Sequence, residues 1–219
     1  KVLKEVSFAE AIELSLFGAK YMHPRALEPV MDTKIPIRIR NAFNLSNEGT
    51  IISKNPSKSS QKIVKSIIAI RNTALIDVSG GGMVGAPGTA AKIFDALARK
   101  SVNIMMISQS PSESSISMVV KKDDLDTAIT TLDLTLLDKV IKNVRVNEDV
   151  AVVAVVGSGM RGIKGIAAKV FSSVSKNSIN VIMIAQGSSE LNLAFGVNNV
   201  DSEKAVKSLH EAVMLTQVN

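Results

Sequence analysis

Two glycine-rich stretches are the residues of this chain whose types and spacing most directly suggest chemistry. Gly80-x-Gly82-x-x-Gly85 and Gly157-x-Gly159-x-x-Gly162 both follow the pattern G-x-G-x-x-G between an apolar run and a helical pattern. A turn of this kind presents backbone N–H groups at the start of a helix, where they attract a carboxylate or another anion. The same glycines could instead serve only a tight turn and close packing. Both interpretations stay open at this point.

A dinucleotide site is the most familiar interpretation of this pattern. Such a unit needs an acidic residue at the end of its second strand and a crossover into further parallel strands. Here the second strands end in Gln109 and Gln186, and a hairpin is expected after each of them. A P-loop is also excluded, because neither stretch continues with Gly-Lys-Ser or Gly-Lys-Thr. An oxidoreductase that uses these turns therefore remains only a less favoured alternative.

Amide side chains accompany both glycine-rich stretches. Asn103 and Gln109 are six residues apart, as are Asn180 and Gln186, so on a strand each pair would share a face. An amide is both a donor and an acceptor, which suits a ligand that carries an ammonium and a carboxylate group. A buried amide without a partner would cost about 1–3 kcal/mol. We therefore expect either a small amino-acid ligand or amides that only cap strand ends.

All these residues belong to one duplicated segment. Residues 78–120 recur 77 positions further on as residues 155–197, without a gap, and Glu113 returns as Glu190. Repeats of about 20–50 residues indicate solenoids, whereas a repeat of this length can fold as a domain with a modest core. Two such domains in one chain are typical of proteins that sense ligands or assemble.

Each copy has the pattern of a strand, the glycine-rich turn, a helix, two strands and a second helix. The first helices are expected over 89–99 and 166–176, and the following strands over 102–108 and 116–120 in the first copy and 179–185 and 193–197 in the second. One more strand would complete a ferredoxin-like β-α-β-β-α-β unit.

The fourth strand of each unit decides how the two copies join. The first copy has one at 143–146, but the second has only six residues left after Val213. We therefore expect the apolar run at 67–70, within residues 66–71, to be donated to the second copy. Residues 71–73 would separate this run from another strand at 74–78. The sequence predicts an α+β fold of two interlocked ferredoxin-like domains.

A different kind of segment precedes the repeats. It predicts a helix over 8–20 and strands over 35–39 and 50–53, followed by a polar stretch that ends near Ser60. We expect three parts: an N-terminal segment with a linker at 1–60, a first domain at 61–147 and a second domain at 148–219.

Composition excludes several classes of function. The chain has 219 residues, 46% of them hydrophobic and 21% charged, and no cysteine, so disulfides and thiolate ligands are excluded. No apolar run approaches the roughly 18 residues of a membrane span, and the first residues do not resemble a secretory signal, so a cytoplasmic protein is expected. His23 and His210 are far apart in sequence, and we expect no metal site or catalytic triad.

The net charge of +6 does not indicate a nucleic-acid partner. Residues 1–72 have 12 Lys and Arg against 6 Asp and Glu, whereas residues 73–219 have 14 of each. A surface that binds nucleic acid usually pairs basic side chains with stacking aromatics. This chain has no Trp, one Tyr and six Phe. We expect no nucleic-acid binding.

Several stretches form a specific combination of motifs. They are Ser7-Phe8-x-Glu10-Ala11-x-Glu13-Leu14, Phe17-Gly18-Ala19-Lys20-x-x-His23-Pro24-Arg25, Ile35-Pro36-Ile37, Gly49-Thr50-Ile51-Ile52, Met83-Val84-Gly85-x-x-Gly88-Thr89-Ala90 and Ile107-Ser108-Gln109-Ser110-x-Ser112-Glu113. With these motifs, nearly the whole chain resembles the C-terminal part of an aspartate kinase, which ends in tandem ACT domains. The N-terminal segment would then be the end of the kinase domain.

The resemblance implies a parent enzyme that transfers the terminal phosphate of ATP to the side-chain carboxylate of aspartate, the first step towards lysine, threonine and methionine. The family's Lys-Phe-Gly-Gly-Thr motif and its other catalytic segments are absent here. We therefore expect no catalytic residue and no cofactor in this chain, with ATP and magnesium bound by the missing kinase domain. The chain would be an excised regulatory part or a separate regulatory subunit that mediates feedback inhibition.

The resemblance also implies an amino-acid effector bound between paired ACT domains. The matching positions are Met83, Gly85, Ala86, Ala90, Asn103, Ile104, Met105 and Gln109 in the first copy, and Met160, Gly162, Asn180 and Gln186 in the second. Lysine-sensitive members tend to have an acidic residue at the position of Met105, which would pair with the ammonium group of the ligand's side chain. That partner is missing here, and a buried unpaired ammonium is costly. Threonine is therefore favoured over lysine.

The paired edges of ACT sheets predict a homodimer. If the modules bind no ligand, a purely structural dimerisation module is the alternative function.

Overall fold

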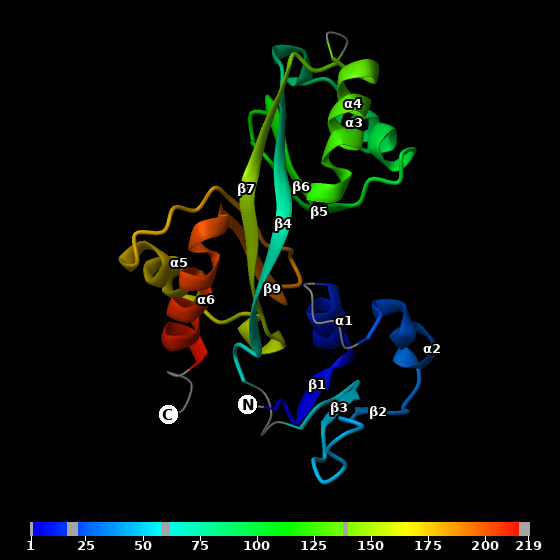
Figure 1. Cartoon of the computed structure of the whole chain (residues 1–219), viewed down its shortest axis with the longest axis vertical. Coiled ribbons are helices and arrows are strands. Elements are labelled where there is room, and N and C mark those ends of the chain that lie inside the picture. Colours follow the sequence, from blue (N-terminus) through cyan, green and yellow to red (C-terminus); the bar gives the residue numbers. More distant parts are fainter. Residues whose placement is uncertain (1, 17–21, 58–61, 138–139, 215–219) are drawn as a thin grey trace.

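The computed structural model describes residues 2–16, 22–57, 62–137 and 140–214. Figure 1 shows an N-terminal segment and two modules that share two long strands, β4 and β7. The first module contains α3 and α4, and the second contains α5 and α6. The N-terminal segment lies beside the second module, where α1 is next to the start of β9.

The N-terminal segment has its own small sheet and core. Its elements are β1 (Glu5–Ser7), α1 (Phe8–Leu16), η1 (Pro24–Leu27), α2 (Glu28–Met31), β2 (Ile37–Ile39) and β3 (Thr50–Ser53). Strand β3 lies between β1, which is parallel to it, and β2, which is antiparallel. Phe8, Ala11, Leu27 and Ile52 are buried together against this sheet. Residues 17–20 of the predicted helix over 8–20 lie outside the described part of the chain.

Helix α1 begins where a capping box predicts a helix start. The hydroxyl of Ser7 accepts a hydrogen bond from the Glu10 amide at 3.1 Å, and the Glu10 carboxylate accepts one from the Ser7 amide at 2.9 Å. This reciprocal pair satisfies two N–H groups that the start of a helix leaves without a helical partner.

The two modules repeat one order of elements. The first has β4 (Ser66–Ser79), η3 (Gly81–Met83), α3 (Thr89–Ala98), β5 (Ile104–Gln109), β6 (Ser115–Lys121), η4 (Lys122–Asp124) and α4 (Leu125–Thr135). The second has β7 (Asn143–Val156), η5 (Ser158–Met160), α5 (Ile166–Lys176), β8 (Met183–Ala185), β9 (Asn192–Asn198), η6 (Asn199–Asp201), α6 (Ser202–Leu209) and η7 (His210–Met214). Strands β5 and β8 both begin later than predicted.

The modules interlock through β4 and β7. The sheet has the order β5-β6-β4-β7-β9-β8, and every pair in it is antiparallel. Residues 75–79 of β4 pair with 143–147 of β7 in the first module, and residues 66–70 pair with 152–156 in the second. Each module thus contains a strand from the other's stretch of sequence. The predicted α+β fold of two interlocked ferredoxin-like domains is confirmed.

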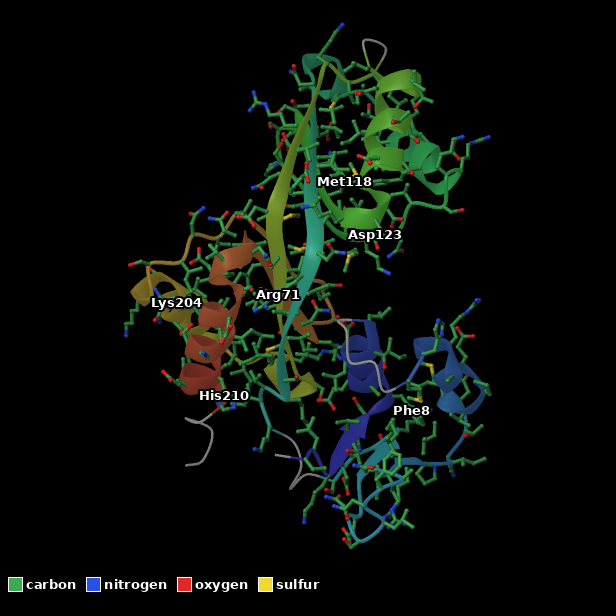
Figure 2. The ribbon with its side chains drawn as sticks, viewed as in Figure 1. Phe8, Arg71, Met118, Asp123, Lys204 and His210 are labelled. Atoms are coloured by element: carbon green, nitrogen blue, oxygen red, sulfur yellow. The ribbon has the colours of Figure 1, made fainter. Side chains whose placement is uncertain are left out.

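One detail of the prediction is wrong, because residues 71–73 do not separate two strands. Strand β4 is continuous, and its pairing with β7 shifts register between Ile70 and Thr73. The residues at this irregularity contact both modules. Arg71 Nε donates to Ser202 Oγ at 3.0 Å in the second module, and Asn72 Nδ2 donates to Asp123 Oδ1 at 3.4 Å in the first. Figure 2 shows Arg71 on β4 where the two modules meet.

The two faces of strand β7 contribute side chains to two different hydrophobic cores. In β7, Ala151, Val153 and Val155 are buried under α5 and α6, whereas the alternate residues Val152 and Ala154 are buried on the opposite face of the sheet. Because successive strand residues point to opposite faces, the unbroken apolar run at 150–156 indicates a strand covered on both sides.

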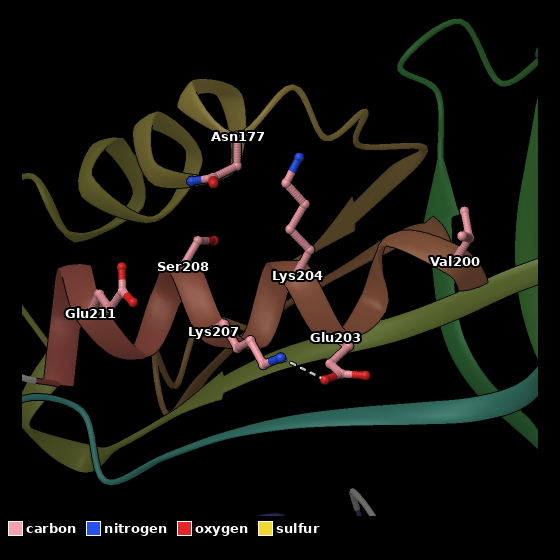
Figure 3. A pocket seen from close by; sticks show the side chains of 7 residues that line it. All are labelled: Asn177, Val200, Glu203, Lys204, Lys207, Ser208 and Glu211. Carbon is pink, nitrogen blue, oxygen red and sulfur yellow. Dashed lines mark ion pairs between the residues drawn. The ribbon is translucent and has the colours of Figure 1, made fainter.

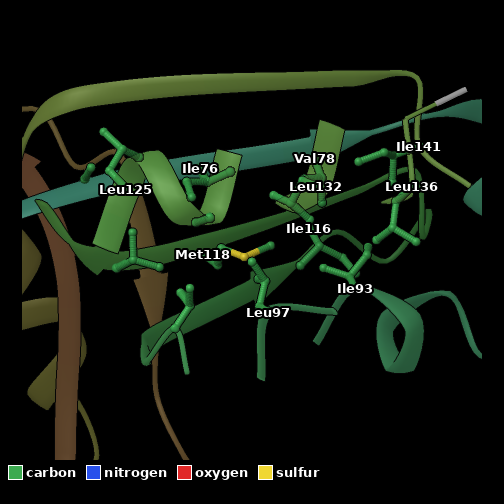
Figure 4. Packing of buried hydrophobic residues seen from close by; sticks show 14 of the residues in the cluster. Ile76, Val78, Ile93, Leu97, Ile116, Met118, Leu125, Leu132, Leu136 and Ile141 are labelled. Carbon is green, nitrogen blue, oxygen red and sulfur yellow. The ribbon is translucent and has the colours of Figure 1, made fainter. Parts of the chain in front are cut away.

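The first module has its own core under α3 and α4. Figure 4 shows Ile76, Met118, Ile93, Leu97 and Leu132 packed between the sheet and these helices. All five side chains are fully buried.

Candidate functional site

Two glycines in each module, one at the end of the G-x-G-x-x-G pattern and one three residues later, determine the backbone conformation of the turn. Gly85 and Gly88 have φ angles of 63° and 84°, and Gly162 and Gly165 have φ angles of 71° and 85°. A Cβ built on any of these four glycines would meet no atom within 4 Å. Their role is therefore conformational, because glycine adopts this left-handed region at little steric cost. Helices α3 and α5 start directly after the second of these glycines.

The earlier glycines have a packing role. A Cβ on Gly157 would lie 2.3 Å from the carbonyl oxygen of Ile63, and one on Gly159 would lie 2.6 Å from that of Lys62. In the first module a Cβ on Gly80 would lie 3.0 Å from the amide nitrogen of Lys142. These glycines let the chain that leads into the interlocking strand pass close to the turn, so the structural interpretation holds for them.

One N–H group of each turn is bonded to a carboxylate of the chain itself. Glu113 accepts from the Gly85 amide at 3.0 Å, and Glu190 accepts from the Gly162 amide at 2.7 Å. Both glutamates have positive φ angles, 56° and 55°, which are uncommon for a non-glycine residue. No role was predicted for either glutamate from the sequence, although their recurrence at the same spacing could have marked them as part of the site. In both turns this N–H group therefore already has an acceptor within the chain.

The glutamines lie at the same end of the sheet as the turns. Gln109 is the last residue of β5 and pairs with Ile116, whose partner on β4 is Val78, two residues before Gly80. In the second module Ala185 pairs with Ala194, so the adjacent Gln186 lies near the Gly157 turn in the same way. Both glutamine side chains are exposed.

The asparagines lie at the other end of these strands. Asn103 precedes β5, and the register of β5 shifts between Ile104 and Met106, so Asn103 and Gln109 do not have the regular six-residue alternation that we assumed. Asn180 likewise precedes β8 by three residues. The structure brings the glutamines near the glycine-rich turns and leaves the asparagines away from them.

The apolar candidates belong mainly to the cores. Met83 and Met160 are buried in the first and second cores. Ala90 and Ile104 pack against the first core, and Met105 is half-buried at the register shift of β5. Ala86 is half-buried in the turn, where its amide donates to the Met83 carbonyl at 3.2 Å. Met83, Ala86 and Met160 belong to the turns and Ala90 to the helix after the first turn, whereas Ile104 and Met105 lie at the far end of β5.

A buried carboxylate of the N-terminal segment contacts the second turn. Glu10 is fully buried, and its Oε1 accepts hydrogen bonds from the amide and the hydroxyl of Ser158, at 2.9 and 2.7 Å. Burial alone would raise the pKa of Glu10, but the hydrogen bonds from Ser7 and Ser158, with the nearby charge of Lys65, lower it below its ordinary value. This contact joins residues 148 positions apart, and no pattern in the sequence indicates it.

Other surface features lie away from these residues. Figure 3 shows a groove between α5 and α6 lined by Asn177, Val200, Glu203, Lys204, Lys207, Ser208 and Glu211. None of the predicted effector residues lines it. In the described residues there is no group of three or more His, Cys, Asp or Glu that could hold a metal ion. Within the same residues no helix is long and apolar enough to cross a membrane.

Comparison with protein families gives a match to both modules. A family model described as the ACT domain matches residues 76–135 and 153–213, which together are more than half of the chain. The bifunctional aspartokinase/homoserine dehydrogenase of Haemophilus influenzae is 38% identical over 217 residues, which are 97% of this chain and 26% of that protein. The chain thus spans about a quarter of the length of this curated relative.

Solved structures give the same result. The aspartate kinase of Clostridium acetobutylicum matches 97% of this chain and 49% of its own length, with a TM-score of 0.84 and 32% identity. The ligand-free regulatory subunit of aspartate kinase from Thermus thermophilus matches 69% of this chain and 99% of its own length, with a TM-score of 0.62 and 30% identity. E. coli aspartokinase III, in complex with lysine and aspartate, matches 97% of this chain and 46% of its own length, with a TM-score of 0.80 and 27% identity.

Proposed function

The chain belongs to the ACT domain family, among the regulatory regions of aspartokinases, and from this premise we propose that it senses L-threonine and inhibits an aspartokinase when threonine accumulates. The chain covers only the regulatory part of such an enzyme. The parent activity that we propose is transfer of phosphate from ATP to L-aspartate, which would take place in a kinase domain outside this chain. Feedback regulation by an amino acid is the role that fits this part.

One observation carries the proposal: the same arrangement of turn and amide occurs in both modules. In each, an exposed glutamine lies at the end of the sheet where the glycine-rich turn lies: Gln109 is the last residue of β5, and Gln186 directly follows β8. The turn offers N–H groups for a carboxylate, and the glutamine offers a donor and an acceptor for an ammonium or hydroxyl group. Two such sites in one chain support ligand sensing.

The residues near the glutamines favour threonine over lysine. Strand β5 has the sequence Ile-Met-Met-Ile-Ser-Gln and contains no acidic residue, and β8 is Met-Ile-Ala. The nearby carboxylate of Glu113 is already bonded to the Gly85 amide. Lysine would bring a second ammonium group to this apolar strand, where a buried charge without a partner is costly. Threonine brings a hydroxyl group that an amide can bind.

Inhibition further requires that the effector prefers one state of the enzyme. An effector can shift an equilibrium only through different affinities for the two states, typically by about 1–3 kcal/mol. The N-terminal segment would transmit this preference, since by the resemblance it is the end of the kinase domain. We also propose that the N-terminal segment ends near residue 60 and that the first ACT domain ends near residue 147.

A structural dimerisation role is the second candidate, and one observation favours it. Ile107 and Ile184 occupy equivalent positions on the edge strands β5 and β8, with 43% and 45% of their surfaces exposed. Unpaired strand edges with apolar side chains pair readily with another copy. We therefore propose a homodimer through the ACT modules, which is compatible with either function.

The dinucleotide alternative receives no support from this geometry. The hairpin strands that follow each turn are antiparallel, as predicted, and the first glycines are packed against residues 62–65 and 140–142.

Calorimetric titration tests the choice between these functions. A sensor releases or absorbs heat with L-threonine and gives a weaker response with L-lysine. A module that only dimerises gives no heat with either amino acid, yet sediments as a dimer.

A further inference from the structure

Helix α1 joins the N-terminal segment to the second module through two carboxylates, one helical turn apart. Glu10 accepts the amide and hydroxyl of Ser158, as described above. Glu13 Oε2 accepts a hydrogen bond from Asn192 Nδ2 at 2.6 Å. Ser158 lies in the glycine-rich turn, and Asn192 is the first residue of β9. The amide of Gly157 donates to the Leu191 carbonyl at 2.9 Å and thus joins these two segments.

The opposite face of α1 is anchored in the N-terminal segment. Phe8 and Ala11 are buried in that segment's core, with 6% and 5% of their surfaces exposed. Directly before this helix, Ser7 donates to Oε2 of Glu10 through its amide and its hydroxyl, while Ser158 donates to Oε1. One buried carboxylate therefore binds both the helix start and the turn.

The first module cannot make this connection. At the position equivalent to Ser158 it has Gly81, which has no side chain. The residue equivalent to Asn192 is Ser115, which lacks the side-chain amide that donates to Glu13. Although the two modules repeat each other closely, only the turn of the second module can present a hydroxyl group to Glu10.

We propose that the contact between Glu10 and Ser158 makes the second module's turn the one whose movement reaches the N-terminal segment. This inference rests on the proposed function, since it names the route by which a ligand in the second module would act. Ser158 lies four residues before Gly162, whose amide is held by Glu190. Local hydrogen bonds connect the intervening backbone, from the Met160 amide to the Gly157 carbonyl at 3.2 Å and from the Ile163 amide to the Met160 carbonyl at 3.0 Å.

A compact turn of this kind transmits a displacement at Gly162 to Ser158. A buried carboxylate with several hydrogen bonds then passes the displacement to α1, because breaking any of them leaves a desolvated group without a partner. Glu10 acts here as a positioning residue that contacts no ligand.

The duplication provides a matched pair of variants for a test that needs no ligand. Gly162→Ala and Gly85→Ala each force a side chain into a left-handed position in an equivalent turn. Hydrogen exchange of the α1 amides, followed by mass spectrometry on the whole chain, is the readout. We expect Gly162→Ala to speed exchange in α1 by at least about fivefold and Gly85→Ala to leave it within about twofold. Equal effects of the two variants would overturn the proposal.

Two further variants test whether the effect on α1 passes through the contact between Glu10 and Ser158 or only reflects a weaker start of the helix. Glu10→Ala and Ser7→Ala both damage the capping box, but only Glu10→Ala removes the acceptor for Ser158. The effect of Gly162→Ala on α1 should disappear in the Glu10→Ala background and persist in the Ser7→Ala background. If Gly162→Ala does not fold, Ser158→Ala replaces it, with Ser172→Ala on the exposed surface of α5 as its control.

Experiments with L-threonine distinguish failure of this inference from failure of the proposed function. Calorimetry first establishes whether L-threonine binds. If it does, slowing of exchange in α1 by threonine should be lost in Gln186→Ala and kept in Gln109→Ala, and the reverse pattern would overturn the link. If no amino acid binds, the proposed function fails, and the ligand-free comparison alone decides whether the turn is coupled to α1.

Discussion

The carboxylate of Glu190 accepts a hydrogen bond from the backbone amide of Gly162 at 2.7 Å, which ties the end of one loop to the glycine-rich turn of the second module. Glu113 makes the same contact with Gly85 in the first module. These pairs hold each turn in a defined conformation, so that its remaining groups are positioned before a ligand arrives.

Removal of this carboxylate should weaken ligand binding at the second module. We expect Glu190→Ala to lower affinity for the effector there about three- to tenfold, because the turn must then be ordered on binding. The free energy of unfolding should fall by no more than about 1 kcal/mol, since the bond is exposed. Titration calorimetry and denaturant unfolding measure the two effects. Tighter binding would show instead that the carboxylate competes with the ligand, and Glu211→Ala on the surface serves as the control.

Because the modules exchange strands, a core mutation next to one interlocking strand should destabilise the module that receives this strand. Val64 precedes the first module in sequence but is fully buried in the second core, whereas its equivalent Ile141 is fully buried in the first core. Truncating either to alanine leaves a cavity and should cost about 2 kcal/mol or more.

Hydrogen exchange locates each effect. Val64→Ala should increase exchange mainly in α5 and α6, and Ile141→Ala mainly in α3 and α4. If Val64→Ala instead loosened α3 and α4, the exchange of strands between the modules would be contradicted.

The buried carboxylate of Glu10 predicts a dependence of stability on pH. Its pKa is lowered below the ordinary value of 4.5, so its contribution is fully present above that value and is lost as pH falls through the lowered pKa. We expect Glu10→Gln to destabilise the chain by about 1–3 kcal/mol at pH 7, with a smaller difference at pH 3.

Denaturant unfolding at pH 7, 5 and 3 measures this difference. Glu28→Gln, at an exposed position, is the control and should show little difference at any pH. A gap between wild type and Glu10→Gln that stayed constant down to pH 3 would mean that the charge of Glu10 does not contribute to stability.

The fold was predictable because the sequence contains the same order of strands and helices in two copies. The second copy of the pattern lacked a fourth strand of its own, so this strand had to come from elsewhere in the chain, and the apolar run at 67–70 was the unassigned candidate. The continuity of β4 was not predictable, since Arg71 and Asn72 are polar and Asn72 has a φ angle of 61°, as in a turn. The backbone pairing of β4 with β6 and β7 shows that the strand continues.

The candidate site was predictable in part. The turns and the glutamines were found because they recur, and recurrence also marked Glu113 and Glu190, although no role was assigned to them. The pairing of Asn103 with Gln109 was wrong, because a register shift within β5 does not show in its sequence. The contact of Glu10 with Ser158 was not predictable, because it depends on how two distant segments pack.

The chain by itself should not transfer phosphate. It lacks the Lys-Phe-Gly-Gly-Thr motif that the resemblance associates with the nucleotide site. We expect no turnover of ATP with L-aspartate above the buffer background in an assay coupled to ADP release. Turnover that increases in proportion to the concentration of the pure chain would contradict this.

Calorimetric titration of the whole chain with L-threonine, and then with L-lysine, tests the central claim most directly. The account predicts heat with threonine that decreases in both Gln109→Ala and Gln186→Ala and disappears when the two are combined, with a weaker response to lysine throughout. No heat with either amino acid, or threonine binding unchanged in the double variant, would contradict it.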